Sequence, residues 1–560
     1  MSSASSELLP AEPFASQRPA ARSMYCSALV AVAGSFMISV LVARAAVAGE
    51  FAVALAVLPY LMLVLGLWWL THGNVVVVVL AAYLVGPAPA DNLLPQVFIF
   101  PHTDYALRAR DMFFLADLVL LFAVLMLAWQ SRFVTSRFVS FPENSAAPTM
   151  PDLRWLAWWC GSLAVLAVYP VLTGIWWGAG QSVSAALQGA TMPLRAVIIA
   201  GLVVLWVRLH GWEATVRDTA RTVIVAGALL AVAAVAALLI AQVLAPGQPQ
   251  FFAFGYPLVV DHRPALPGWG NNILSNYLCV CVVAAVLLRQ HIRWPRGGTL
   301  VAIAMLLLGL VFTESRVAML VSLIVVFTPI VIGVLRRIRP RRGALPAIAA
   351  ASSVAVLLCV VTAVALPILN PRFNTLTPGV LAHQLPRASD PNYATQHRSS
   401  GPESGADVGG ESFSTRGGLV QAATAIWQRA PIVGSGWNSW GWAKSEENPR
   451  LVVAVDPHNG LLWLLAETGA LGVLLLYAIP IALAVRRPRL AWLWAVPAVA
   501  TLLELVNPNV RNGHFAVVVW VLVTLAMTAP RAGSSHDMAF SSHAVWAKVN
   551  PAPETPGGVR

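Results

Sequence analysis

Long runs of apolar residues recur along the whole chain, and they restrict its fold more than any other feature. A helix needs about 20 apolar residues to cross the roughly 30 Å hydrocarbon core of a bilayer. Lipid offers no partners for backbone polar groups, so each crossing segment must be helical. The sequence therefore predicts an all-α polytopic membrane protein with about 14 transmembrane helices, in a range of 12–14. The runs lie at 24–43, 51–70, 75–88, 111–128, 155–177, 191–208, 221–243, 271–289, 298–313, 317–335, 344–368, 459–485, 490–506 and 514–530.

The composition excludes the other broad classes of protein. Hydrophobic residues make up 58% of the 560 residues and charged residues only 11%, whereas charged residues make up about 25% of a typical soluble domain. Lys and Arg exceed Asp and Glu by 36 to 24, which gives a net charge of +12. This excess collects in one alternate set of the segments between the apolar runs, with 22 basic residues against six in the opposite set. The positive-inside rule then predicts that both termini are cytoplasmic, and no nucleic-acid partner is expected.

The spacing of the apolar runs predicts how the chain is organised. We expect a cytoplasmic tail at 1–23, helices 1–11 within 24–368, a large periplasmic loop at 369–458, helices 12–14 within 459–530, and a disordered cytoplasmic tail at 531–560. Within the predicted loop, 386–412 is small and polar, which favours disorder. The stretch 417–430 predicts an amphipathic helix on the membrane surface, and Gly434-Ser435-Gly436 predicts a turn after it.

Cysteines and histidines give no sign of a disulfide framework or a metal site. All five cysteines lie within predicted spans, so no disulfide is expected in the large loop. The loop histidines, His383, His397 and His458, are widely spaced. The sequence therefore predicts neither a metal nor a cofactor.

His458 is the strongest candidate for chemistry. Asp456 is a good helix N-cap and Pro457 suits the first helical position, which places His458 in the first turn of the helix that begins there. The positive end of the helix dipole disfavours a second proton on the imidazole, so His458 is suited to accept a proton from a hydroxyl. The alternative is an interfacial histidine in a helix whose glycines serve helix packing. On a continuous helix, Glu467 lies on the face opposite His458.

Three arginines are candidates for binding an anion on the same side of the membrane. Arg316 follows a turn of two or three residues and begins a span, where the helix dipole repels a cation, so an anionic partner is expected. That partner is either a phosphate, which matches the guanidinium fork, or a local group such as Glu314 or lipid headgroups. Arg195 lies near the outer end of a span, where a charge is costly. Arg416 precedes the amphipathic stretch, and an ordinary surface arginine is its alternative.

Tryptophans cluster in the same predicted loop. Trp427, Trp437, Trp440 and Trp442 lie within 16 residues. They either anchor the loop at the membrane interface, the commoner role, or stack on sugar rings.

Together, these segments resemble the O-antigen ligase and polymerase superfamily of bacterial envelope enzymes. The likeness lies in TESRVAMLVSL at the start of a span, RGGLVQAATAIWQRAPIVGSGWNSW at the end of the large loop, and DPHNGLLWLLAETGALGVLLLY after it. PGWGNNILSNYL is a looser match, and the resemblance covers roughly 265–485.

The resemblance implies a metal-independent glycosyltransferase at the outer face of the bacterial inner membrane, with a glycan on undecaprenyl diphosphate as donor. By motif, His458 would activate the acceptor hydroxyl, Arg316 would hold the diphosphate and Arg416 would assist. Asp456 and Asn459 are expected to contact substrate, and Arg195 is added because of its cost in the membrane. The acceptor is either another repeat unit, as in a polymerase, or lipid A core, as in a ligase. A flippase or other transporter, or a scaffold with a docking loop, remains the alternative.

Overall fold

The computed structural model describes the helical parts of the chain. The described residues are 62–85 except 63, 70 and 72, then 119–127, 153–177, 183–248, 250–253, 256–260, 263–264, 266, 271–292, 294, 296–342, 407–440, 443, 459–505 and 513–530. Asp456 and His458, the predicted spans at 24–43 and 344–368, and the predicted tails at 1–23 and 531–560 lie outside them.

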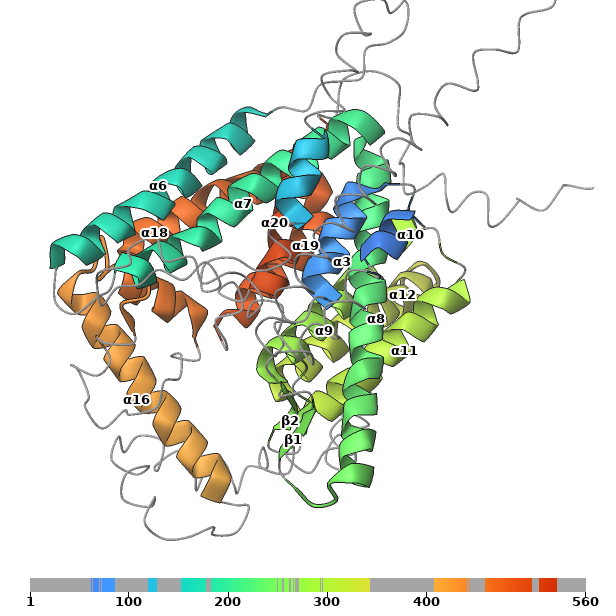
Figure 1. Ribbon diagram of the computed structural model, residues 1–560. Coiled ribbons are helices and arrows are strands. Elements are labelled where there is room, and N and C mark those ends of the chain that lie inside the picture. Colours follow the sequence, from blue (N-terminus) through green and yellow to red (C-terminus); the bar gives the residue numbers. More distant parts are fainter. Residues whose placement is uncertain are drawn as a thin grey trace, which may run out of the picture.

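The described helices form one bundle (Figure 1). Its long apolar helices are α6 (Arg154–Trp177), α7 (Val183–His210), α8 (Trp212–Leu244), α12 (Arg316–Arg342) and α18 (Gly460–Arg486). Each contains a stretch long and apolar enough to cross a membrane. The shorter helices are α3 (Val75–Val85), α9 (Asn271–Leu287), α10 (Arg289–Ile292), α11 (Arg296–Thr313), α16 (Asp407–Arg429), η5 (Pro488–Leu490), α19 (Ala491–Leu503) and α20 (Gly513–Met527).

The helical class predicted from the apolar runs is confirmed. The run at 155–177 matches α6 and the run at 298–313 matches α11, each within two residues. Five helices qualify as spans by length and composition among the described residues, and five shorter apolar helices lie beside them. The number 14 stays a prediction.

A small antiparallel sheet was not predicted. Strands β1 (Gln250–Ala253), β2 (Tyr256–Val260) and β3 (Arg263–Pro264) pair in the order β1-β2-β3, with an irregularity between Phe251 and Phe252. The sheet lies beside the C-terminal end of α8 (Figure 1). At 1.5 Å per residue, the 33-residue α8 is about 50 Å long, longer than the hydrocarbon core. Its surplus length therefore brings its end to the sheet.

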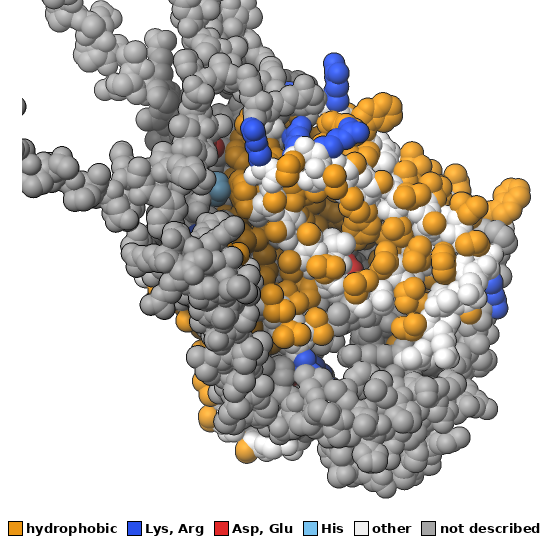
Figure 2. Space-filling view, turned by 180° about the vertical axis from the view of Figure 1, so that it is seen from behind, with side chains coloured by type: hydrophobic (Ala, Val, Ile, Leu, Met, Phe, Trp, Pro, Cys, Tyr) orange, Lys and Arg blue, Asp and Glu red, His pale blue; other side chains and the backbone are white. Residues whose placement is uncertain are grey.

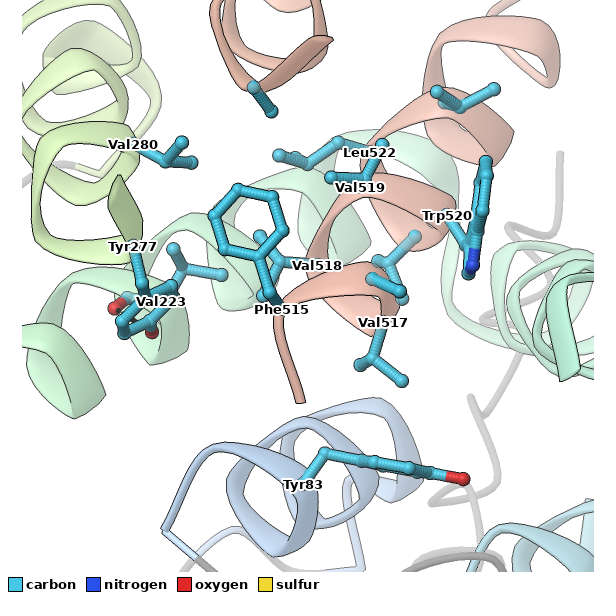
Figure 3. Packing of buried hydrophobic residues seen from close by; sticks show 14 of the residues in the cluster. Tyr83, Val223, Tyr277, Val280, Phe515, Val517, Val518, Val519, Trp520 and Leu522 are labelled. Atoms are coloured by element: carbon cyan, nitrogen blue, oxygen red, sulfur yellow. Dashed lines mark hydrogen bonds between the residues drawn. The ribbon is translucent and has the colours of Figure 1, made fainter. Parts of the chain in front are cut away.

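Helix α20 is the centre of the bundle. All 15 of its residues are buried, and it packs against α3, α7 and α19. In Figure 3 its residues Phe515 and Val518 face Tyr277 of α9 and Val223 of α8. A helix that is apolar on all sides is stable only when neighbours surround it. The outer helices instead expose apolar side chains, and Figure 2 shows a described surface that is largely hydrophobic.

Polar contacts define one end of the bundle, which we call the basic end. Here Asn74 Nδ2 donates to Asp218 at 2.8 Å, Arg221 donates to the carbonyl of Ile292 at 2.8 Å, and Arg487 donates to the carbonyl of Met527 at 3.2 Å. A cation at the C-terminus of α20 complements the helix dipole. The opposite end, which we call the loop end, holds the sheet, α16 and the first residues of α12 and α18 (Figure 1).

Prolines inside two helices are compensated by tryptophans. Pro170 in α6 and Pro480 in α18 lack the N–H that would bond the carbonyl four residues earlier. Trp437 Nε1 donates to that carbonyl at Leu166, and Trp159 Nε1 donates to the one at Leu476, both at 3.1 Å. Each indole therefore satisfies a buried acceptor that lipid could not satisfy.

Candidate functional site

The start of α18 differs from the predicted start. Asn459, not Asp456, is the N-cap, since its side chain accepts the N–H of Leu462 at 2.9 Å. The expected cap at Asp456 and first turn at His458 are therefore wrong: the helix begins at Gly460. Asn and Asp are equally good caps, so the local sequence offered two starts. The N–H of Gly460 donates to the carbonyl of Glu504 at the end of α19.

Helix α18 is broken at Gly469. This glycine has φ 64° and ψ −172°, a conformation that only glycine adopts readily. A Cβ at this position would overlap the carbonyl of Ile432. The side-chain faces predicted for a continuous helix are therefore wrong beyond residue 468. Gly469 allows close contact with another segment, which agrees with the packing role considered for the glycines of this helix.

The segment that follows α16 fills the break. In an unbroken helix the N–H groups of Ala470 and Leu471 would bond the carbonyls of Ala466 and Glu467. Instead, the two N–H groups donate to the carbonyls of Pro431 and Ile432, at 2.9 and 3.0 Å. The freed carbonyls of Ala466 and Glu467 accept N–H groups from Ser435 and Gly436, at 3.0 and 2.8 Å. Two helical bonds are thus replaced by four bonds between segments. We call residues 430–440 together with 464–472 the α18 joint.

The turn in the joint agrees with the predicted one. Gly434 and Gly436 have φ values of 70° and 100°, and a Cβ on Gly434 would overlap the backbone of Glu467. The turn therefore needs glycine at both positions, for its conformation and for close contacts, which Gly434 makes with α18 and Gly436 with α6.

Trp437 and Trp440 are core residues, which the sequence did not predict. Trp437 has no exposed surface and Trp440 only 4%. The Trp437 indole reaches Leu166, near the middle of α6, and a Cβ on Gly189 of α7 would lie 2.5 Å from its Cβ. Neither tryptophan is available to the interface or to a sugar. Trp427 is half-buried and donates to the carbonyl of Pro431, while Trp442 lies outside the described residues.

Glu467 is a buried carboxylate that the sequence analysis set aside. It has no exposed surface, and its Oε1 accepts the N–H of Trp440 at 3.2 Å. The sequence feature that could have identified Glu467 is a single acidic residue in an otherwise apolar run. An ionisable residue within a membrane span is a functional candidate by default. Glu467 was set aside because it lies on the helix face opposite His458. Glu504, at the end of α19, is 3% exposed and was also missed.

Arg316 is the first residue of α12, as predicted. The turn between α11 and α12 consists of Glu314 and Ser315, and Glu314 has a positive φ of 57°. The carbonyl of Ser315 accepts the N–H of Met319, which starts the helix. Arg316 is half-buried and lies at the loop end, at the N-terminus of α12, whose first N–H groups have no partner within the helix. Both features suit an anion.

Arg195 and Arg416 lie on other helices. Arg195 is half-buried in α7, two residues after Pro193. Arg416 lies inside α16 rather than ahead of a helix, because α16 begins at Asp407, ten residues before the predicted start. The polar stretch 386–412 is therefore helical from 407 onward. The side chain of Arg416 is outside the described part of the structure.

Arg316 and Asn459 lie at the same end of the bundle but on different helix pairs, whereas Arg195 lies in the middle part of α7. Helix α12, which carries Arg316, packs on α9 and α11, whereas α18, which begins after Asn459, packs on α6 and α16. Helix α19 contacts α9, and its end bonds the start of α18. The structure thus separates Arg316 from Asn459 by α9 and α19, and it joins the α16 and α18 segments directly.

No metal-binding cluster is found in the described residues, where no three His, Cys, Asp or Glu side chains come together suitably. The predicted independence of metal stays a prediction, since His458 and Asp456 are outside these ranges.

Comparison with known families supports one of the alternatives for this arrangement. Residues 277–477 match the family model described as O-antigen ligase. This part of the chain is similar to the O-antigen ligase family. The matched range runs from α9 through α12 and α16 into α18, and it includes Arg316, Arg416, His458 and Asn459. The resemblance to the O-antigen ligase and polymerase superfamily is confirmed. A search of curated proteins found no significant match.

The matched range is not self-contained in the fold. Its Trp437 contacts Leu166 and Gly189, which precede the matched range. Arg195 also precedes it. Family and apolar helices together support an enzyme of surface polysaccharide assembly in a bacterial membrane, with a lipid-linked glycan and an acceptor as substrates.

Proposed function

We propose that the protein transfers a glycan from undecaprenyl diphosphate to an acceptor hydroxyl at the periplasmic face of the inner membrane. The observation that carries this proposal is the O-antigen ligase match, which covers both the Arg316 turn and the start of α18. These two sites begin apolar helices at the same end of the bundle, where a lipid-linked substrate can present its headgroup (Figure 1).

The proposed reaction is a direct displacement at the anomeric carbon. The acceptor oxygen forms a bond to this carbon while the bond to the diphosphate oxygen breaks, and undecaprenyl diphosphate leaves with the electron pair. His458 accepts the hydroxyl proton as general base. Attack from the face opposite the leaving group inverts the anomeric configuration, which the linkage of the product, measured by NMR, would test.

Arg316 is proposed to stabilise the charge that develops on the diphosphate. A guanidinium fixed at a helix start, in a partly dry site, stabilises this charge more in the transition state than water does. Arg416 is proposed to assist from α16. Asn459 Oδ1 is occupied by the cap, so its amide N–H groups are the ones proposed to contact substrate. Asp456 and Arg195 are retained as proposed substrate-binding residues.

The experiment is a glycan profile of cells that lack the protein and are complemented with wild type, His458→Ala or the control His291→Ala. His291 stacks on Trp492 at the basic end, far from the proposed chemistry. Loss of function in His458→Ala but not in the control supports the proposal. Single repeat units accumulating on lipid identify a polymerase, whereas long chains on lipid with bare lipid A core identify a ligase. Equal profiles for both variants would overturn the proposal in favour of a transporter.

A further inference from the structure

The carboxylate of Glu467 has no role in the mechanism proposed above, although the fold places it at the centre of the α18 joint. Glu467 is fully buried two residues before Gly469, and its Oε1 accepts the N–H of Trp440 at 3.2 Å. A carboxylate inside an apolar bundle is costly unless it is well bonded, and such residues are rare. The position therefore calls for a reason beyond packing.

The bond from Glu467 ties two parts of the chain into one body. Trp440 lies in the segment that continues from α16, so a side chain of α18 holds the main chain of that segment. The four backbone bonds across the break act in the same direction, and Ser435 Oγ adds a fifth bond, to the carbonyl of Ala466 at 2.9 Å. Helix α16 and the first part of α18 are thereby fixed relative to each other.

The first part of α18 also carries the site. Glu467 lies eight residues after Asn459, or about 12 Å along the helix. We propose that Glu467 is a positioning residue for glycosyl transfer: its bond to Trp440 sets the start of α18, which follows His458, relative to α16, which carries Arg416. This inference rests on the proposed function and assigns to it a residue that does not touch the reacting atoms.

The packing predicts which kinetic constant changes. The joint contacts α6 and α7, whereas Arg316 begins α12, which packs on α9 and α11. Loss of the Glu467 bond displaces the start of α18 relative to α16, and it leaves Arg316, the main proposed contact of the donor diphosphate, in place. A misplacement of about 1 Å in a reacting group can cost about 100-fold in rate. Glu467→Ala should therefore lower kcat by about 10- to 100-fold and leave the donor KM within about twofold.

The test is steady-state transfer by the purified full-length protein, with lipid-linked donor varied at saturating acceptor. Glu467→Gln keeps a side-chain oxygen that accepts the N–H of Trp440, so it should retain kcat within about fivefold of wild type. Glu213→Ala, which removes an exposed carboxylate at the basic end, is the matched control and should match wild type. Size-exclusion profiles and thermal midpoints confirm that equal amounts of folded protein are compared.

Three results would overturn the positioning role while the wild type is active. These are an unchanged kcat in Glu467→Ala, a raised donor KM with unchanged kcat, or a Glu467→Gln variant as slow as Glu467→Ala. If Glu467→Ala does not fold, Ser435→Ala decides the matter. This variant loses the two side-chain hydrogen bonds of Ser435, to the carbonyl of Ala466 and to Ser439 Oγ, and should lower kcat about fivefold at an unchanged donor KM. A wild-type kcat would overturn the inference. Absence of product from the wild type with either acceptor would overturn the proposed function itself.

Discussion

The pairing of Trp437 with Pro170 predicts a coupling free energy that can be measured. The Leu166 carbonyl is buried in α6, and it accepts the Trp437 indole N–H at 3.1 Å because residue 170 has no N–H to give. Trp437→Phe leaves this carbonyl without the indole, at a cost of about 1–3 kcal/mol, in addition to the loss of packing. With alanine at position 170, a backbone N–H replaces the indole, and only the packing loss remains.

The double-mutant cycle of Trp437→Phe and Pro170→Ala should therefore show a coupling of about 1–3 kcal/mol. The assay is the free energy of unfolding in mixed detergent, followed by tryptophan fluorescence. Trp158→Phe in α6 removes an indole that is 72% exposed and should not couple to position 170. If the effects of Trp437→Phe and Pro170→Ala add within about 0.5 kcal/mol, the carbonyl does not depend on the indole and the reasoning is refuted.

Three further predictions follow from single positions. Gly469→Ala should destabilise the fold by about 3 kcal/mol or more, because the alanine is strained at this backbone conformation and overlaps the carbonyl of Ile432. The control Gly161→Ala should be neutral or stabilising, because its Cβ meets nothing within 4 Å. The thermal midpoint is measured for both variants. Arg316→Lys should raise the donor KM about 10-fold, because one ammonium replaces a bidentate fork; an unchanged donor KM would exclude the diphosphate contact. Burial lowers the pKa of His291 below its usual 6.5, and the charge of Glu213 opposes this shift. The neutral His291 therefore stabilises the fold above pH 6.5, and this contribution is lost as the pH falls. His291→Gln should flatten the decline of the thermal midpoint between pH 7 and 5.

The apolar runs predicted most helices because lipid imposes a local requirement. Every backbone group in a span must find its partner within the same helix, so length and hydropathy alone determine the element. The run at 155–177 is α6 almost residue for residue. Where side chains could satisfy the backbone, the prediction was less accurate: α8 begins at Trp212 rather than 221, and Asp218 in its first turns bonds Asn74.

The candidate site was predicted in its residues but not in its geometry. Arg316 stands at a helix start as expected, since the turn before it is only two residues long. The cap at Asn459 was missed because Asp456 is as good a cap, and the choice depends on the bond from Gly460 to Glu504. The break at Gly469 depends on partners more than 30 residues away, which no local pattern in α18 reveals.

A broken helix inside a membrane protein requires a partner segment, and this determines how the segment between α12 and α18 is attached. Two N–H groups and two carbonyls freed at the break would each be costly in lipid, so the fold is possible only with residues 431–436 in place. The predicted boundary at 458 separates loop from helices in the sequence, yet the described end of that segment packs against α6, α7 and α18. Changes between 430 and 440 should therefore affect the helix bundle as strongly as changes in the spans, and the position of α16 should follow that of α18.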